Sequence, residues 1–203
     1  MYLSRASARA RMGALVLILG LSLASSSFAG EAQSREAQGQ SLSTVSIENF
    51  GRINDRYYRG AQPEGRDYAD LARLGIRTVI DLRNDGEIAE AGEVRSAGMT
   101  FYRIPMTTTT QPAPGAVAQF LGIVNDPANQ PVYVHCVGGR HRTGIMTAVY
   151  RMVQDGWTAD RAYTEMQQYG FGPAFLHSAL KNFVYDYYTR IDRATAVPTG
   201  AGG

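Results

Sequence analysis

The feature that most constrains this chain is a ten-residue segment, His135–Gly144 (HCVGGRHRTG), set between two apolar stretches. Residues 131–135 (PVYVH) are rich in β-branched and aromatic side chains and predict a buried strand. Residues 142–154 are apolar nearly all round, which predicts a helix inside the domain. A strand that enters such a helix through a glycine-containing loop turns backbone N–H groups and the positive end of the helix dipole toward one point. The segment therefore predicts a binding site for a tetrahedral oxyanion.

Cys136 lies at the centre of this predicted loop. The inward amides and the helix N-terminus favour the thiolate, which is the reactive form of cysteine. Arg142 follows six positions later, where its planar guanidinium can grip two oxygens of the anion and stabilise a charged transition state. Gly138 and Gly139 are expected to let the backbone curl inward where a Cβ would clash. The pattern predicts Cys136 as a nucleophile within an anion-binding loop over Val137–Arg142.

Two neighbours of Cys136 are expected to support it. His135 would orient the loop and help to hold the thiolate. The hydroxyl of Thr143 would donate to the sulfur and ease hydrolysis of a cysteinyl-phosphate. The expected course is phosphoryl transfer to Cys136 followed by attack of water. No metal or other cofactor is expected, because the amides and Arg142 supply the electrostatics.

Some residues of the segment allow a second interpretation. A cysteine after a core strand can be a buried structural residue, but the surrounding His, Gly-Gly, Arg and Thr-Gly favour chemistry at Cys136. Arg140 and His141 stay open between two interpretations. They form either a solvated face of the loop or extra positive charge for a multiply phosphorylated substrate, such as a phosphoinositide or an inositol polyphosphate.

The segment His135–Gly144 resembles the loop of cysteine-dependent protein tyrosine and dual-specificity phosphatases. With a basic residue and a His before Arg142, the segment is most similar to the loop of the atypical dual-specificity phosphatases of plants and fungi and of their bacterial relatives. Some members of that group act on inositol pyrophosphates. Residues 57–63 (YYRGAQP) and 76–83 also resemble that family. The resemblance implies an α/β fold with a central, mainly parallel sheet flanked by helices. It implies hydrolysis of phosphomonoesters, either phosphotyrosine or an inositol-containing phosphate.

The chain departs from this family at the proton donor. The family carries an Asp general acid on a loop that corresponds to residues 105–115 (PMTTTTQPAPG), and this loop holds no Asp or Glu. A general acid contributes roughly 10²–10⁴ in rate. Three explanations stay open: Asp85 substitutes from the turn after a predicted parallel strand, the substrate has a good leaving group, or turnover is slow. Asp85 is equally well explained as a turn residue before Gly86.

Two other functions fit the same segment. A sulfurtransferase also uses a loop cysteine, although the ending Arg142-Thr143-Gly144 favours phosphate. A phosphate-binding pseudophosphatase would bind without turnover, which the absent Asp would explain.

The N-terminus predicts a secretory signal peptide. Three arginines within residues 1–11 precede an apolar stretch, 13–24, that falls short of the ~20 residues of a membrane span. Residues 27–29 (SFA) suit signal peptidase, so we expect cleavage after Ala29 and a periplasmic or secreted protein. An uncleaved N-terminal anchor is the alternative.

Charge and cysteine content narrow the class of partner. Residues 1–29 hold three of the 20 basic residues and none of the 18 acidic ones, so the cleaved chain would carry a net charge of −1. This excludes a generally basic nucleic-acid-binding protein. Cys136 is the one cysteine of the sequence, so no intramolecular disulfide can form. We expect a monomer without stable membrane insertion after cleavage, acting on a phosphorylated protein or an inositol phosphate.

The rest of the sequence indicates one domain over residues 46–193. Residues 30–45 are polar and predict a flexible leader, and residues 194–203 are small and glycine-rich and predict a disordered tail. Predicted strands span 57–59, 76–82, 99–104 and 131–135; predicted helices span 63–74, 87–97, 116–124 and 142–154, with two more beginning after Thr158 and at Pro173. Such alternation predicts an α/β sheet with mainly parallel strands.

Overall fold

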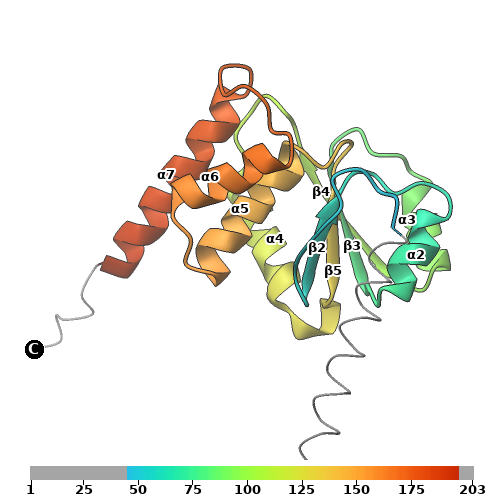
Figure 1. Ribbon diagram of the computed structural model, residues 1–203. Helices are drawn as coiled ribbons and strands as arrows, with labels where there is room; N and C mark the ends of the chain where they lie inside the picture. The colour runs from blue at the N-terminus through green and yellow to red at the C-terminus, as the bar shows by residue number, and fades with distance from the viewer. Residues whose placement is uncertain (1–44, 197–203) are drawn as a thin grey trace, which may run out of the picture. The chain divides into compact units, whose positions relative to one another are not determined.

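The structure is a computed structural model that describes residues 45–196 (Figure 1). The signal peptide predicted over residues 1–29 lies outside these residues, as do the predicted leader up to residue 44 and the tail from residue 197. The last helix, α7 (Ser178–Ala196), continues past the predicted end of the domain at residue 193. Within residues 45–196, no helix has both the length and the apolar character needed to cross a membrane.

Five strands form one sheet in the order β1-β2-β5-β3-β4. The strands are β1 (Gly51–Asn54), β2 (Tyr57–Gly60), β3 (Thr78–Arg83), β4 (Thr100–Met106) and β5 (Val132–His135). Strand β1 pairs antiparallel with β2, and the other three pairings are parallel. The prediction of a mainly parallel sheet is therefore confirmed. In the register, His135 at the end of β5 lies beside Gly60 of β2 and Asp81 of β3.

Helices cover both faces of this sheet. They are α2 (Asp67–Arg73), α3 (Glu90–Ser96), α4 (Pro114–Asn125), α5 (Arg142–Gln154) and α6 (Ala159–Gln168), together with α7 and the 3₁₀ turn η1 (Pro127–Asn129). Helices α2 and α3 lie on one side, and α4 to α7 lie on the other (Figure 1). Alternate side chains of β5 point to the two faces of the sheet, because Tyr133 belongs to the core beneath α2 and α3, whereas Val134 belongs to the core that includes Ile145 of α5. The strand is thus buried on both sides.

The predicted elements around His135–Gly144 have the expected positions. Helix α5 spans the predicted residues 142–154 and is buried along most of its length. Helix α6 begins after Thr158 as predicted, and the Thr158 hydroxyl caps it by accepting from the backbone N–H of Arg161 at 3.3 Å. The loop between β5 and α5 is therefore fixed at both ends by buried elements.

The predicted starts of three helices were too early, and one of these, α3, begins at Glu90 instead of residue 87. Helix α2 begins at Asp67 instead of residue 63, because Gly65 has a φ of +50°, which no α-helix contains. Helix α7 begins at Ser178 instead of Pro173. Residues 173–177 instead form short turns, in which the N–H of Leu176 donates to the carbonyl of Pro173 at 3.1 Å.

Candidate active site

The loop between β5 and α5 approaches strand β2 very closely. Gly139 has a φ of +65°, and a Cβ placed on it would lie 2.5 Å from the carbonyl carbon of Gly60. Only glycine fits there without a shift of backbone. Gly138 differs from the expectation, because a Cβ on it would meet only the side chain of Arg140 at 3.5 Å. One of the two glycines is therefore required by the packing.

Cys136 is buried at the end of β5, with 4% of its surface exposed, and no other cysteine exists to pair with it. The helix α5 that follows the loop presents its N-terminus to the same loop, with His141 at the N-cap. A helix of thirteen residues carries a partial positive charge at this end. Cys136 therefore lies in the loop that the positive end of this helix faces.

Arg142 is the first residue of α5 and is 5% exposed. Its Nη1 lies 3.4 Å from Oδ1 of Asn84, 3.3 Å from Oδ1 of Asp85 and 3.2 Å from the carbonyl oxygen of Met106. These acceptors come from the ends of β3 and β4. The guanidinium is thus held by the loops at the carboxyl edge of the sheet, where ligands of open α/β sheets bind.

Asp85 is brought to the site, although its side chain is 67% exposed. A hydrogen bond from its own backbone N–H and the contact with Arg142 both lower the pKa of Asp85. Both contacts favour the carboxylate, whereas a general acid must carry a proton. A bound phosphate dianion would oppose this effect, since like charges raise the pKa of a carboxyl. The assignment of Asp85 as the acid stays a prediction.

His135 lies behind the loop and is fully buried. Its Nε2 lies 2.8 Å from Oε1 of Glu90 on α3. Oε1 of Glu90 also accepts from Gln62 at 3.0 Å, and Oε2 accepts from Arg83 at 2.8 Å. Burial alone would raise the pKa of Glu90, but His135 and the other partners lower it below the ordinary value. The sequence offered no signal for Glu90, whose role depends on contacts across the fold.

The group around Glu90 extends into a buried charge cluster. Arg83 Nε donates to Oδ1 of Asp81 at 3.0 Å, and Arg103 Nε donates to Oδ2 of Asp81 at 2.9 Å. Asp81, Glu90 and His135 also lie close enough to share a metal ion. The two arginines already bind both carboxylates, whereas Nδ1 of His135 has no hydrogen-bond partner among the described residues.

Thr143 is fully buried in the first turn of α5. Its backbone carbonyl accepts from the Thr147 hydroxyl at 2.8 Å, while its own Oγ1 has no hydrogen-bond partner among the described residues. An unpartnered buried hydroxyl suits a role toward the adjacent sulfur or a bound anion. That role stays a prediction.

The outer part of the loop is partly exposed. Val137 is 56% exposed, and Arg140 forms an ion pair with Glu48. His141 Nε2 lies 3.0 Å from the carbonyl oxygen of Phe171, and its ring centroid lies 3.8 Å from that of His177. Burial and the neighbouring His177 lower the pKa of His141, which favours its neutral form. Arg140 is thus partly neutralised, and the two interpretations of this pair both stay open.

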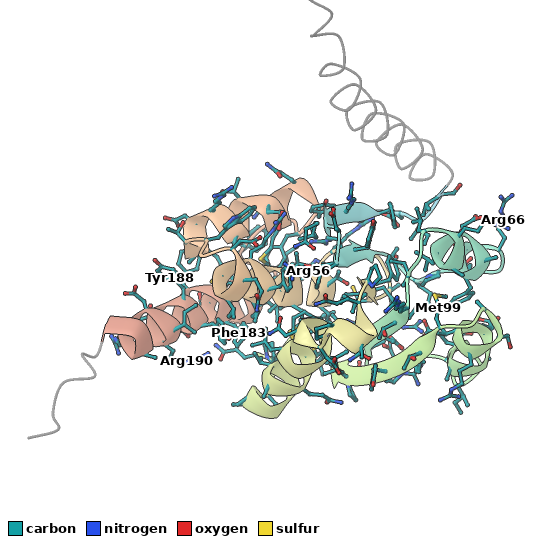
Figure 2. All side chains as sticks on the ribbon, turned by 90° about the horizontal axis from the view of Figure 1, so that it is seen from below. Arg56, Arg66, Met99, Phe183, Tyr188 and Arg190 are labelled. Atoms are coloured by element: carbon teal, nitrogen blue, oxygen red, sulfur yellow. The ribbon has the colours of Figure 1, made fainter. Side chains whose placement is uncertain are left out.

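The acid-free loop before α4 borders a cavity of about 500 Å³ between α4 and α7. Phe183 and Arg190 of α7 line this cavity and lie near one another in Figure 2. Pro112 and Pro114, which belong to the loop over residues 105–115 where the family carries its acid, line the same cavity, and no carboxylate does so. The cavity contains none of the predicted site residues.

A model of the family described as "DSP-PTPase phosphatase fused to NAD+ Kinase" matches residues 40–183. The chain belongs to this phosphatase family. Dual specificity protein phosphatase TpbA of Pseudomonas aeruginosa is 31% identical over 124 residues, which cover 61% of this chain and 56% of TpbA. Inositol diphosphatase SIW14 of Saccharomyces cerevisiae is 27% identical over 133 residues, which cover 63% of this chain and 47% of SIW14. The chain therefore spans about half the length of these relatives.

Solved phosphatase structures share the fold. A crystal structure of P. aeruginosa TpbA has a TM-score of 0.60 and 29% identity, covering 73% of this chain and 92% of that one. A structure of TpbA in complex with pTyr has a TM-score of 0.59 and 27% identity, covering 73% and 91%. The Siw14 catalytic domain with citrate has a TM-score of 0.59 and 23% identity, covering 73% and 93%, and supports the fold alone. The resemblance to dual-specificity phosphatases is confirmed.

Proposed function

We propose that the chain is a cysteine-dependent phosphatase that hydrolyses phosphomonoesters through Cys136. The observation that carries the proposal is the pairing of Cys136 and Arg142 at the two ends of one loop, both buried at the carboxyl edge of the sheet. Membership of the phosphatase family supports it. The ordering of Arg142 by three acceptors also supports it, because a preorganised guanidinium costs little to align with a phosphate.

The proposed reaction has two steps. In the first, the Cys136 thiolate attacks phosphorus, a P–S bond forms, the bond to the leaving oxygen breaks, and that oxygen takes up a proton. In the second, water attacks the cysteinyl-phosphate, the P–S bond breaks, and phosphate and the thiolate are released. Arg142 binds two equatorial oxygens in both steps, and the Thr143 hydroxyl donates to the departing sulfur. His135 holds the end of β5 through Glu90.

The proton donor of the first step is proposed to be Asp85. It is the carboxyl group in contact with Arg142, and it occupies the turn after β3. The loop over residues 105–115 has no carboxyl group that could replace it. Substrates with good leaving groups would depend on Asp85 least, since their leaving oxygen needs little protonation.

Two substrate classes follow from the relatives, whose names are dual specificity protein phosphatase and inositol diphosphatase. A phosphotyrosine protein and an inositol-containing phosphate are therefore the proposed partners. One panel separates them: aryl phosphate, phosphotyrosine and phosphoserine peptides, phosphoinositides and inositol polyphosphates, with thiosulfate as a test for sulfur transfer. Turnover of thiosulfate alone, or tight binding without any turnover, would overturn the proposed function.

We also propose that the protein is exported to the periplasm or secreted, through the signal predicted over residues 1–29. The support is the sequence pattern that ends in Ser27-Phe28-Ala29. The mass of the purified mature protein tests this directly. A new N-terminus at Gly30 in an exported fraction is expected, and an intact N-terminus in the cytosol would contradict export.

A further inference from the structure

The carbonyl groups of the candidate phosphate loop are hydrogen-bonded on the outside. A loop that directs its N–H groups at an anion must direct its carbonyls away, and those carbonyls need donors when buried. The carbonyl of Val137 accepts from the backbone N–H of Gln62 at 3.0 Å, and the carbonyl of Gly138 accepts from Asn49 Nδ2 at 2.7 Å. The carbonyl of Gly139 accepts from Arg59 Nη2. Three successive carbonyls are thus satisfied from one stretch of chain.

Residues 49–62 form this supporting segment of the loop. It contains β1 and β2, and β2 is fixed beside β5 by parallel pairing from Tyr57 to Gly60. Asn49 has a φ of +53°, an uncommon conformation for a residue other than glycine. In this conformation the side chain of Asn49 reaches the carbonyl of Gly138, which is 89 positions away in the sequence. The segment is therefore built to contact the loop from outside.

Arg59 is the unusual member of the supporting segment. Its side chain is fully buried, and its Nε and Nη1 have no hydrogen-bond partner among the described residues. It forms no ion pair with a carboxylate of the described residues; its guanidinium carbon lies 3.8 Å from the centre of the Tyr169 ring. Burial lowers the pKa of Arg59. A buried cation without a counter-ion is costly, so stability alone does not explain it.

The charged and titratable groups around Arg59 point to its counter-ion. They are Tyr57 on β2, Tyr169 after α6, Glu165 on α6 and Cys136 after β5. Burial raises the pKa of Tyr57, which keeps it neutral; Tyr169 contacts the guanidinium through its ring; and Glu165 already binds Arg151 at 2.7 Å. Cys136 is the group in this set that gains a negative charge in the proposed function, either as a thiolate or with phosphate bound.

We propose that Arg59, together with Asn49, is a positioning residue that holds the loop carbonyls outward and places a buried positive charge under Cys136. The proposal rests on the proposed function, because it needs a thiolate or a bound phosphate as the counter-charge. Arg59 acts through Gly139 and through its field, and it does not contact the substrate. Asn49 holds the carbonyl of Gly138 in the same way, but it carries no charge.

The test compares Arg59→Met and Arg59→Lys with wild type and with Arg56→Met. Arg56 lies in the same hairpin, is exposed, and makes no side-chain contact that the structure identifies, so Arg56→Met controls for the loss of one charge. Cys136 is the one cysteine of the chain, so the rate of alkylation by iodoacetamide against pH reports its thiol pKa without interference. Protection by inorganic phosphate reports anion affinity.

Arg59→Met is expected to raise the pH midpoint of alkylation by about one unit and to weaken phosphate protection about tenfold. Arg59→Lys should return the pH midpoint of alkylation most of the way to the wild-type value, because it keeps the charge, while protection by phosphate stays weakened. Arg56→Met should match wild type in both. A midpoint and a protection constant unchanged in folded Arg59→Met would overturn the proposal.

Asn49→Gly keeps the test decisive if Arg59→Met does not fold. Glycine accepts the positive φ of this position, so the variant removes the donor to Gly138 and leaves the backbone conformation available. Weaker phosphate protection with an unchanged alkylation midpoint is expected, and unchanged protection would count against the supporting role. If wild type itself fails to hydrolyse aryl phosphate, the proposed function fails, whatever the variants do.

Discussion

The guanidinium of Arg142 lies 3.3 Å from the carboxylate of Asp85, so the residue proposed to grip phosphate already contacts an anion. The side chain of Asp85 is largely exposed, so solvent reaches its carboxylate while it contacts Arg142. The contact keeps Arg142 oriented in the free protein. It also means that phosphate and Asp85 compete for one cation.

Asp85→Asn should therefore separate two roles of this carboxyl group. Loss of the negative charge should strengthen inhibition by inorganic phosphate a few-fold, because the dianion no longer meets a carboxylate. Turnover of an alkyl phosphate should fall about 10²-fold, while turnover of an aryl phosphate with a good leaving group should change little. Steady-state kinetics with both substrates and phosphate as inhibitor measure both effects.

The role of Asp85 as the acid also predicts how activity depends on pH. The pKa of Asp85 is lowered in the free protein, so its protonated fraction falls early as the pH rises. If Asp85 is the acid, activity on an alkyl phosphate should decline on the alkaline side as Asp85 loses its proton, and Asp85→Asn should lack that decline. An identical profile in the variant would remove Asp85 as the donor.

Gly139 and Gly138 should respond very differently to alanine. A Cβ on Gly139 would lie 2.5 Å from backbone of Gly60, and its φ is positive, so Gly139→Ala should lower the melting temperature by about 5 °C or more and weaken phosphate binding. Gly138→Ala is the matched control, since its Cβ would meet only a side chain at ordinary distance. Equal behaviour of the two variants in thermal unfolding would contradict the observed packing.

Glu90→Gln tests the buried network behind the loop. Removing the charge leaves Arg83 facing a neutral amide inside the domain, which should lower the free energy of unfolding by about 3 kcal/mol. Chemical denaturation measures it. Glu87→Gln, at an exposed position of the preceding loop, should leave that free energy almost unchanged.

The same substitution should change the pH dependence of stability. The folded pKa of Glu90 is lowered from 4.5 to about 2, so its contribution is complete above pH 4.5 and is lost as the pH falls toward 2. Glu90→Gln should remove this part of the acid destabilisation. A variant that loses stability with acid as steeply as wild type would show that Glu90 is not the responsible group.

The sequence predicted the parts of the site that are close together in the chain. The apolar strand before Cys136 and the helix from Arg142 follow from local composition, and the structure places both as expected. Strand β1 was missed because its four residues become a strand only through pairing with β2. Residues 63–66 were assigned to a helix because the local pattern did not reveal the positive φ of Gly65.

Arg59, Asn49 and Glu90 were missed for a different reason. Arg59 contacts the carbonyl of Gly139 across 80 positions of sequence, and Glu90 contacts His135 across the sheet. Each of these residues has an ordinary role when only its neighbours in sequence are considered. Their importance depends on the register that sets β2 and β3 beside β5, which local periodicity does not determine.

The central claim, that Cys136 is the nucleophile, is tested most directly by trapping the intermediate. Wild-type protein mixed with labelled aryl phosphate and quenched in acid should carry one phosphate on Cys136, located by mass spectrometry of the peptide. Cys136→Ser should bind phosphate but carry no label and show no turnover. Turnover by Cys136→Ser at the wild-type rate, or label on a residue other than Cys136, would contradict the account.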